Sequence, residues 1–167
     1  PPRSTLFPYT TLFRSYLTKP VRQSDLYDSL VTTLSGKAAL YEKKPLVADH
    51  TAGAMRRDNV HILLAEDNIT NQQVALGILR KLGLRAEAVA NGVEAIKALE
   101  TIPYDLVFMD VQMPEMNGYE ATRVIRDVQS GVLNHNVPII AMTAHAMEGD
   151  RDRSEEHTSE LQSPNTI

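Results

Sequence analysis

The stretch VHILLAED, residues 60–67, decides the fold class. It is a short apolar run that ends in two acids, which is the pattern of a buried strand leading into a polar edge. YDLVFMD (104–110) repeats the pattern and ends in an acid, and VPIIAMTA (137–144) repeats it and carries a hydroxyl at Thr143. Continuous apolar strands of this kind are typical of parallel sheets that helices cover on both faces.

Helical patterns separate these strands. Apolar residues recur at helical spacing after Asn68, and Gly83 is placed to end that helix. A weaker strand is expected over 84–90, a second helix after the Asn-Gly turn at 91–92, and a third helix over 119–128. Strands that alternate with helices predict an α/β protein with a doubly wound parallel sheet.

Four polar residues stand at the predicted strand ends. Ligand sites of such sheets lie at the carboxyl ends of the strands, so these residues should converge at one edge. Three carboxylates in one pocket repel one another, and with oxygen ligands and no cysteine they suit a hard divalent ion such as Mg²⁺. The four residues are Glu66, Asp67, Asp110 and Thr143.

The same residues suit phosphoryl transfer. An aspartate can form an aspartyl phosphate, and the transferred group then needs a metal ion, a hydroxyl donor and a cation. We assign none of residues 60–152 as that cation and look for it upstream. YLTKP (16–20) reads as a strand end followed by Lys19, and residues 21–34 carry leucines at every fourth position, as in an amphipathic helix. Residues 36–59 are polar and aperiodic, which predicts a linker.

Composition narrows the class of protein. Net charge is -4, and there is no basic run to follow phosphates, so we expect no nucleic-acid partner. The apolar runs are too short to span a bilayer, and no signal peptide is visible, so we expect a cytoplasmic location without direct membrane contact. A parent protein anchored in a membrane is compatible with both expectations.

Three motifs in order, ILLAEDN, FMDVQMPEMNG and IIAMTAHAMEGDR, resemble the response-regulator receiver domain of hybrid sensor histidine kinases. The resemblance covers residues 60–152. It implies a flavodoxin-like (CheY-like) three-layer sandwich with strand order 2-1-3-4-5. It also implies Asp110 as the phosphoacceptor and Thr143 as the switch hydroxyl. The Mg²⁺ ligands would be Glu66, Asp67, Asp110 and the backbone carbonyl of Gln112.

YLTKPVRQSDLYDSL resembles the last strand and helix of the same family. Lys19 then matches the lysine that pairs with the phosphoryl group, Tyr16 matches the aromatic switch position, and the Lys19-Pro20 bond is a candidate for cis. This unit precedes the domain instead of ending it. We therefore interpret residues 16–35 as the end of an upstream receiver, and 60–152 as a second receiver truncated after its fourth strand.

The two pieces together make one complete set of units. Residues 16–34 could complete the sheet in circularly permuted order, because a flexible linker of this length reaches roughly 25–30 Å. Lys19 would then lie beside Asp110. Eleven residues at each end, TLFPYTTLFRS and RSEEHTSELQS, resemble translated sequencing adapters. We therefore predict that residues 1–15 and 153–167 are not native and exclude them from functional reasoning.

The leading hypothesis is a phosphoacceptor module of a two-component phosphorelay. Its phosphodonor would be a histidine kinase or a histidine phosphotransfer domain. The alternatives are a degenerate receiver that serves only as an interaction domain, and a hydrolase that works through an aspartyl phosphate. The hydrolase would need a second acid two residues after Asp110, where Gln112 stands. No ATP-binding glycine motif of a kinase is present.

Overall fold

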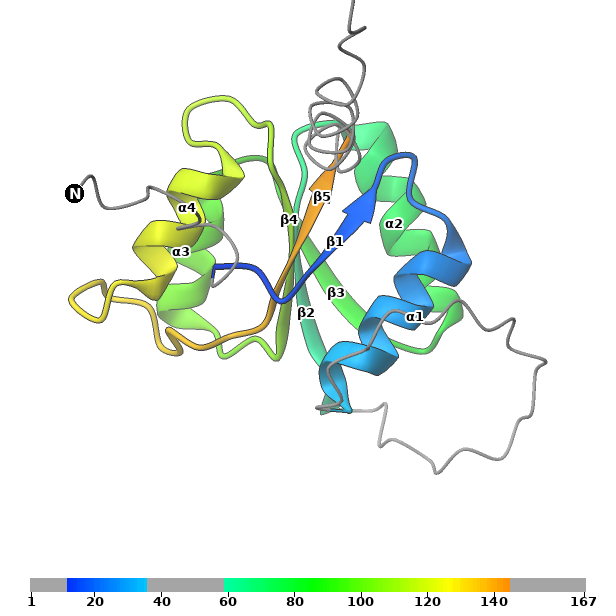
Figure 1. The fold of residues 1–167 in the computed structure, drawn as a ribbon, viewed down its shortest axis with the longest axis horizontal. Helices are drawn as coiled ribbons and strands as arrows, with labels where there is room; N and C mark the ends of the chain where they lie inside the picture. The colour runs from blue at the N-terminus through cyan, green and yellow to red at the C-terminus, as the bar shows by residue number, and fades with distance from the viewer. Residues whose placement is uncertain (1–11, 36–58, 145–167) are drawn as a thin grey trace, which may run out of the picture.

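The computed structural model describes residues 12–35 and 59–144, and in them five strands form one parallel sheet (Figure 1). The sheet order is β3-β2-β4-β5-β1, which places β1 at an edge beside β5. Counted along the chain from β2, with β1 taken last, this order reads 2-1-3-4-5. The elements are β1 Ser15–Thr18, α1 Gln23–Leu34, β2 His61–Ala65, α2 Ile69–Lys81, β3 Arg85–Val89, α3 Gly92–Thr101, β4 Leu106–Asp110, α4 Gly118–Arg126 and β5 Ile139–Thr143.

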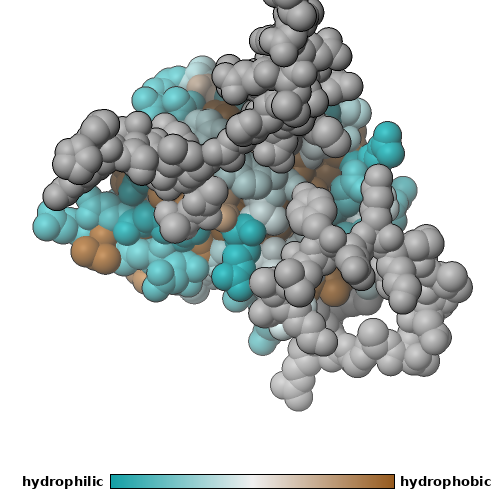
Figure 2. Space-filling model, viewed as in Figure 1, coloured by the Kyte–Doolittle hydropathy of each residue, from teal (hydrophilic) through white to brown (hydrophobic). Residues whose placement is uncertain are grey.

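The helices form two outer layers. Helices α1 and α2 lie on one side of the sheet and α3 and α4 on the other (Figure 1). Successive side chains of a strand point to opposite faces, so Leu63 packs toward α3 and α4 while Ile62 and Leu64 pack toward α1 and α2. All five residues of β4 are buried, as expected of a central parallel strand. Over α3 and α4 the described surface is mainly hydrophilic (Figure 2).

Local signals set the helix boundaries close to where the sequence predicts them. The side chain of Asn68 caps α2, and Gly83, with φ 76°, follows its end, as expected for a left-handed residue after a helix. The expected helix over 119–128 ends earlier, at Arg126, and Val128 is 78% exposed beyond it. The cause is the backbone of Asp127, which turns extended with ψ 116°.

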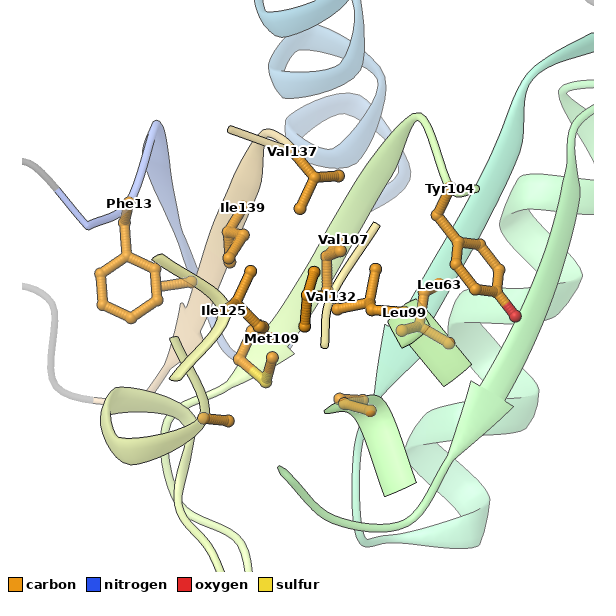
Figure 3. Close-up of a cluster of buried hydrophobic side chains, with 14 residues drawn as sticks. Phe13, Leu63, Leu99, Tyr104, Val107, Met109, Ile125, Val132, Val137 and Ile139 are labelled. Carbon is orange, nitrogen blue, oxygen red and sulfur yellow. The ribbon is translucent and has the colours of Figure 1, made fainter. Parts of the chain in front are cut away.

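Residues 12–15 contribute to the sheet and to the core, which we had not expected. We excluded residues 1–15 from functional reasoning, yet β1 begins at Ser15 and the amide of Arg14 donates to the carbonyl of Ile139 at 2.7 Å. Phe13 is only 5% exposed and lies at one end of the core cluster on the α3 and α4 side (Figure 3). Whatever their origin, residues 12–15 take part in the fold of this chain, because a large apolar side chain next to a sheet edge gains by burial. Their contacts therefore count in the structural arguments that follow.

Several predicted segments lie outside the described residues. They are residues 1–11, 145–152 and 153–167, together with the linker except its last residue. The adapter origin of the two ends stays a prediction. Among the described residues, the helices are all too short or too polar to cross a bilayer.

Candidate functional site

Three carboxylates meet where β2 and β4 end. Glu66 and Asp67 follow β2, and Asp110 is the last residue of β4, which pairs with β2 in parallel register. Ligand oxygens of the three lie within 4.8 Å of one another. Glu66 and Asp110 are each 2% exposed, whereas Asp67 is exposed. The structure therefore brings together the acids that the sequence placed at strand ends.

Lys19 completes this cluster from the far end of the chain. It follows β1, and its Nζ lies 2.8 Å from Oε2 of Glu66 and 2.6 Å from Oδ2 of Asp110. Its backbone amide donates to the carbonyl of Thr143 at 3.0 Å, and its bond to Pro20 is cis. The prediction that Lys19 lies beside Asp110 is confirmed, and one ammonium group bridges two buried carboxylates.

Burial and charge act in opposite directions at this ion pair. Burial alone would lower the pKa of Lys19, but the hydrogen bonds and charges of Asp110 and Glu66 outweigh it, and the pKa is raised. Burial raises the pKa of Asp110, and the charge of Glu66 adds to it, while Lys19 and a backbone amide offset part of the rise. The two acids therefore hold Lys19 charged, while ionised Asp110 remains costly for the fold.

Two side chains that the sequence reasoning missed hold Glu66 in place. Nδ2 of Asn71 donates to Oε1 of Glu66 at 3.3 Å, and Nε2 of Gln72 donates to its carbonyl oxygen at 2.6 Å. Both stand in the first turn of α2. The side chain of Asn68, which caps α2, accepts from the amide of Asn71 at 3.1 Å. Asn71 and Gln72 could both have been suspected from the sequence, because polar residues in the first helix turn after a strand-end acid face the same sheet edge as that acid.

The loop after β4 positions Asp110. The amide of Gln112 donates to Oδ1 of Asp110 at 3.1 Å, so each oxygen of that carboxylate has a partner. The amide of Gly118 donates to the carbonyl of Val111 at 3.0 Å, and a Cβ at Gly118 would collide with the carbonyl oxygen of Asp110. Glycine is required for this close approach. The expected role of the Gln112 carbonyl as a metal ligand stays a prediction.

Thr143 and Tyr16 lie on the neighbouring strands. Thr143 ends β5, one residue beyond Met142, the residue in register with Asp110. Tyr16 is 44% exposed, and its ring centroid lies 5.7 Å from that of Phe13. Phe13 in turn contacts Tyr119 edge to face at 5.5 Å. Burial, with a contribution from Tyr119, raises the pKa of Tyr16. The structure thus adds Tyr119 to the aromatic residues near the site.

Of the three acids, Asp67 opens onto a surface pocket on the α4 side. This pocket of about 610 Å³ is lined by Asp67, Gln112, Asn117 and Tyr119 and by the loop between β4 and α4. The site combines the two buried carboxylates of Glu66 and Asp110, the exposed carboxylate of Asp67 and the ammonium group of Lys19.

Comparison with known proteins assigns a family to this arrangement. The family model described as "Response regulator receiver domain" matches residues 62–158. A hybrid signal transduction histidine kinase K of Dictyostelium discoideum is 40% identical over 111 residues, which cover 62% of this chain and 9% of that protein. The sensor histidine kinase GacS of Pseudomonas protegens is 41% identical over 90 residues, covering 54% and 10%. The chain thus spans about a tenth of the length of these relatives.

Solved structures of receiver domains are also similar. The receiver domain of sensor histidine kinase PA1611 from Pseudomonas aeruginosa PAO1, solved with magnesium in its active site cleft, is 46% identical. The match covers 56% of this chain and 74% of that one, with a TM-score of 0.49. The receiver domain of the histidine kinase CKI1 from Arabidopsis thaliana is 30% identical, with coverage of 60% and 77% and a TM-score of 0.47.

Proposed function

The chain belongs to the response-regulator receiver family, and from that premise we propose that Asp110 accepts a phosphoryl group from a phosphohistidine. The observation that carries this proposal is the cluster in which Glu66, Asp67 and Asp110 lie within 4.8 Å, with the ammonium of Lys19 on two of them. A nearly buried carboxylate between acids and a cation suits a transient covalent phosphoryl site.

The donor set of the cluster fits Mg²⁺. All three side chains offer carboxylate oxygens, and Mg²⁺ prefers such ligands while keeping several waters. Glu66, Asp67 and Asp110, with the carbonyl of Gln112, would hold the ion. When bound, the ion would neutralise part of the acidic charge and the charge on the phosphoryl oxygens.

The transfer itself uses the residues that orient Asp110. A carboxylate oxygen of Asp110 forms the bond to phosphorus while the bond from phosphorus to the imidazole nitrogen breaks. The nitrogen keeps the electron pair. The imidazole leaves neutral when its other ring nitrogen carries a proton; otherwise it leaves as an imidazolate that takes a proton from solvent. The Gln112 amide fixes the carboxylate, and Lys19, held by Glu66, offsets charge on the phosphoryl oxygens.

Thr143 and Tyr16 are the proposed responders. Phosphorylation adds about -1.5 to -2 charges to the pocket. The hydroxyl of Thr143, at the end of the strand next to Asp110, would turn toward the new oxygens. Tyr16, which is 44% exposed on the edge strand, has room to follow. Local charge at Asp110 would thus be converted into a change on the surface near β1 and β5.

The wider assignments rest on the family. We propose a histidine kinase or a histidine phosphotransfer domain as the phosphodonor, and a hybrid histidine kinase as the parent. We also keep the interpretation of residues 16–35 as the last strand and helix of an upstream receiver, which here complete the second receiver in circularly permuted order. The presence of Glu66, Asp67 and Asp110 argues against a degenerate receiver, and Gln112 in place of an acid argues against a hydrolase.

A labelling experiment tests the proposal. The purified chain, given a small acyl phosphate and Mg²⁺, should acquire one acid-stable, base-labile phosphoryl group, and chelation of Mg²⁺ should prevent it. Asp110→Asn should abolish labelling, while Asp28→Asn, at an exposed position of α1, should not change it. Labelling of the Asp110→Asn variant at the original level would refute the assignment.

A further inference from the structure

We propose that residues 12–34 of one chain dock on the β5 edge of a second copy of this chain, in the same way as they dock on β5 of their own chain. One copy's Lys19 would then serve the other copy's site. The proposal concerns the docking of this segment, called here the β1–α1 unit. It rests on the proposed function only for the role that Lys19 plays after docking.

Main-chain hydrogen bonds hold the unit along one strand edge. Ser15–Thr18 pairs with Ile140–Thr143 in parallel register. The pairing continues beyond both ends of β1, where the Arg14 amide donates to the Ile139 carbonyl and the Lys19 amide to the Thr143 carbonyl. Such bonds require an open edge and an extended segment, whichever chain supplies them.

Apolar anchors secure the unit on both faces of the sheet. Phe13, 5% exposed, enters the cluster on the α3 and α4 side (Figure 3). Leu17, Leu26 and Leu30 are at most 5% exposed and enter the opposite cluster. Without the unit, the core would expose apolar surface on both faces beside β5. A vacant edge of this kind recruits another strand, which is the hazard that edge strands carry.

Two polar clamps make the docking specific. Arg126 donates to the carbonyl of Leu12 from Nε at 3.3 Å and from Nη2 at 2.9 Å, and from Nη1 to the carbonyl of Val137 at 2.7 Å. At the other end of β1, Lys19 bridges Glu66 and Asp110. The clamps therefore fix the register of the unit at both ends, and both are made by groups that any copy of the chain carries.

None of these contacts depends on the covalent path between unit and core. That path runs from residue 35 to residue 58. The same contacts are therefore available within one chain and between two, and exchange of identical elements is a low-cost route to a dimer. An element tethered to its own binding site has an effective concentration there on the order of 1 mM. The exchanged form should be about 1% at roughly 10 µM protein and about half near 1 mM.

Cysteine cross-linking of full-length chains tests the proposal, because the natural chain has no cysteine. Thr18 and Thr143 are in register, and neighbouring strands lie about 4.8 Å apart, within disulfide reach. One copy carries Thr18→Cys and the other Thr143→Cys. Mild oxidation of the mixture should give an interchain disulfide whose yield rises with concentration. The double variant in one chain should close within itself at low concentration. Replacing Thr143→Cys by Lys97→Cys, at an exposed position of α3, gives the background.

A second substitution, Leu17→Asp, distinguishes the copy that donates the unit from the copy that receives it. Leu17→Asp in the Thr18→Cys copy removes an anchor from the donated unit and should reduce the yield to background. Leu17→Asp in the Thr143→Cys copy vacates its own edge and should raise the yield several-fold at the same concentration. If Leu17→Asp prevents folding, Lys19→Ala replaces it with the same two expected signs.

Two results would overturn the proposal. One is an interchain yield that never exceeds the Lys97→Cys background. The other is a yield that does not respond in opposite directions to the same substitution in the two copies. The disulfide is read without Mg²⁺ or phosphodonor, so its failure leaves the labelling at Asp110 untouched. Loss of that labelling in turn leaves this test intact.

Discussion

Replacing Lys19 by methionine should show how far the site depends on one ammonium group. The change keeps most of the side chain's length and apolar stem but leaves Glu66 and Asp110, both 2% exposed, without their shared cation. Breaking a buried pair costs about 3–5 kcal/mol, and because the Lys19 side chain is 22% exposed we expect about 2–3 kcal/mol.

Thermal unfolding measures this cost. For a domain of about 100 residues, 1 kcal/mol shifts Tm by about 4 °C, so Lys19→Met should lower Tm by about 8–12 °C near neutral pH. Lys97→Met, at an exposed position, should change Tm by less than about 2 °C. In the double variant Lys19→Met, Asp110→Asn the repulsion between two acids is gone, so the loss should be clearly smaller than in Lys19→Met alone.

The pH dependence has a definite sign. The pKa of Lys19 is raised, so its stabilising contribution is fully present below the ordinary lysine value of about 10.4 and is lost as pH rises through the raised value. The difference between wild type and Lys19→Met should therefore vanish at strongly alkaline pH. It should also shrink in acid, where Asp110, whose pKa burial raises, takes up a proton and no longer needs the cation. Equal Tm values for Lys19→Met and Lys97→Met at pH 7 would contradict the reasoning.

Three further predictions concern Gly118 beside the site, Gly77 in α2, and the Tyr104–Glu87 contact at the opposite sheet edge. Gly118→Ala should destabilise by about 1–3 kcal/mol in chemical denaturation, because the new Cβ would collide with the Asp110 carbonyl. Gly77→Ala, where nothing lies within 4 Å of the added Cβ, should instead stabilise α2 by about 0.5–1 kcal/mol. Tyr104→Phe removes the hydroxyl that donates to Glu87 at 2.6 Å. This hydrogen bond is the main cause of the lowered pKa of Glu87, so that pKa should rise in an NMR titration of the variant. An unchanged Glu87 titration would count against the bond.

The apolar runs that form strands, and the acids that follow them, could be located from the sequence. Period and residue type are local properties, and each run that ends in an acid carries its own signal. Glu66, Asp67 and Asp110 could be assigned to one edge because parallel strands end on the same side of a sheet. The same reasoning misjudged Val128, since a backbone turn at the end of α4 leaves no trace in the apolar pattern.

Contacts between distant segments needed the tertiary structure. The partners of Asn71 and Tyr119 could not be assigned from the sequence, because what matters is the carboxylate or ring that each one meets. Phe13 lies in a stretch without any period, and its burial follows from the space beside β5. The contacts of such side chains depend on the shape of the surrounding space and on the partner group, and the spacing of neighbouring residues in the sequence contains neither.

Residue patterns alone were enough to predict an α/β sheet with a carboxylate cluster at one edge, and to single out Lys19 as a cation in need of acids. That Lys19 reaches both Glu66 and Asp110 of this same chain, at 2.8 and 2.6 Å, depends on long-range packing. The contact forms because β1 fills the edge of β5. An edge accepts any extended segment that satisfies its hydrogen bonds and covers its apolar faces, wherever that segment stands in the chain.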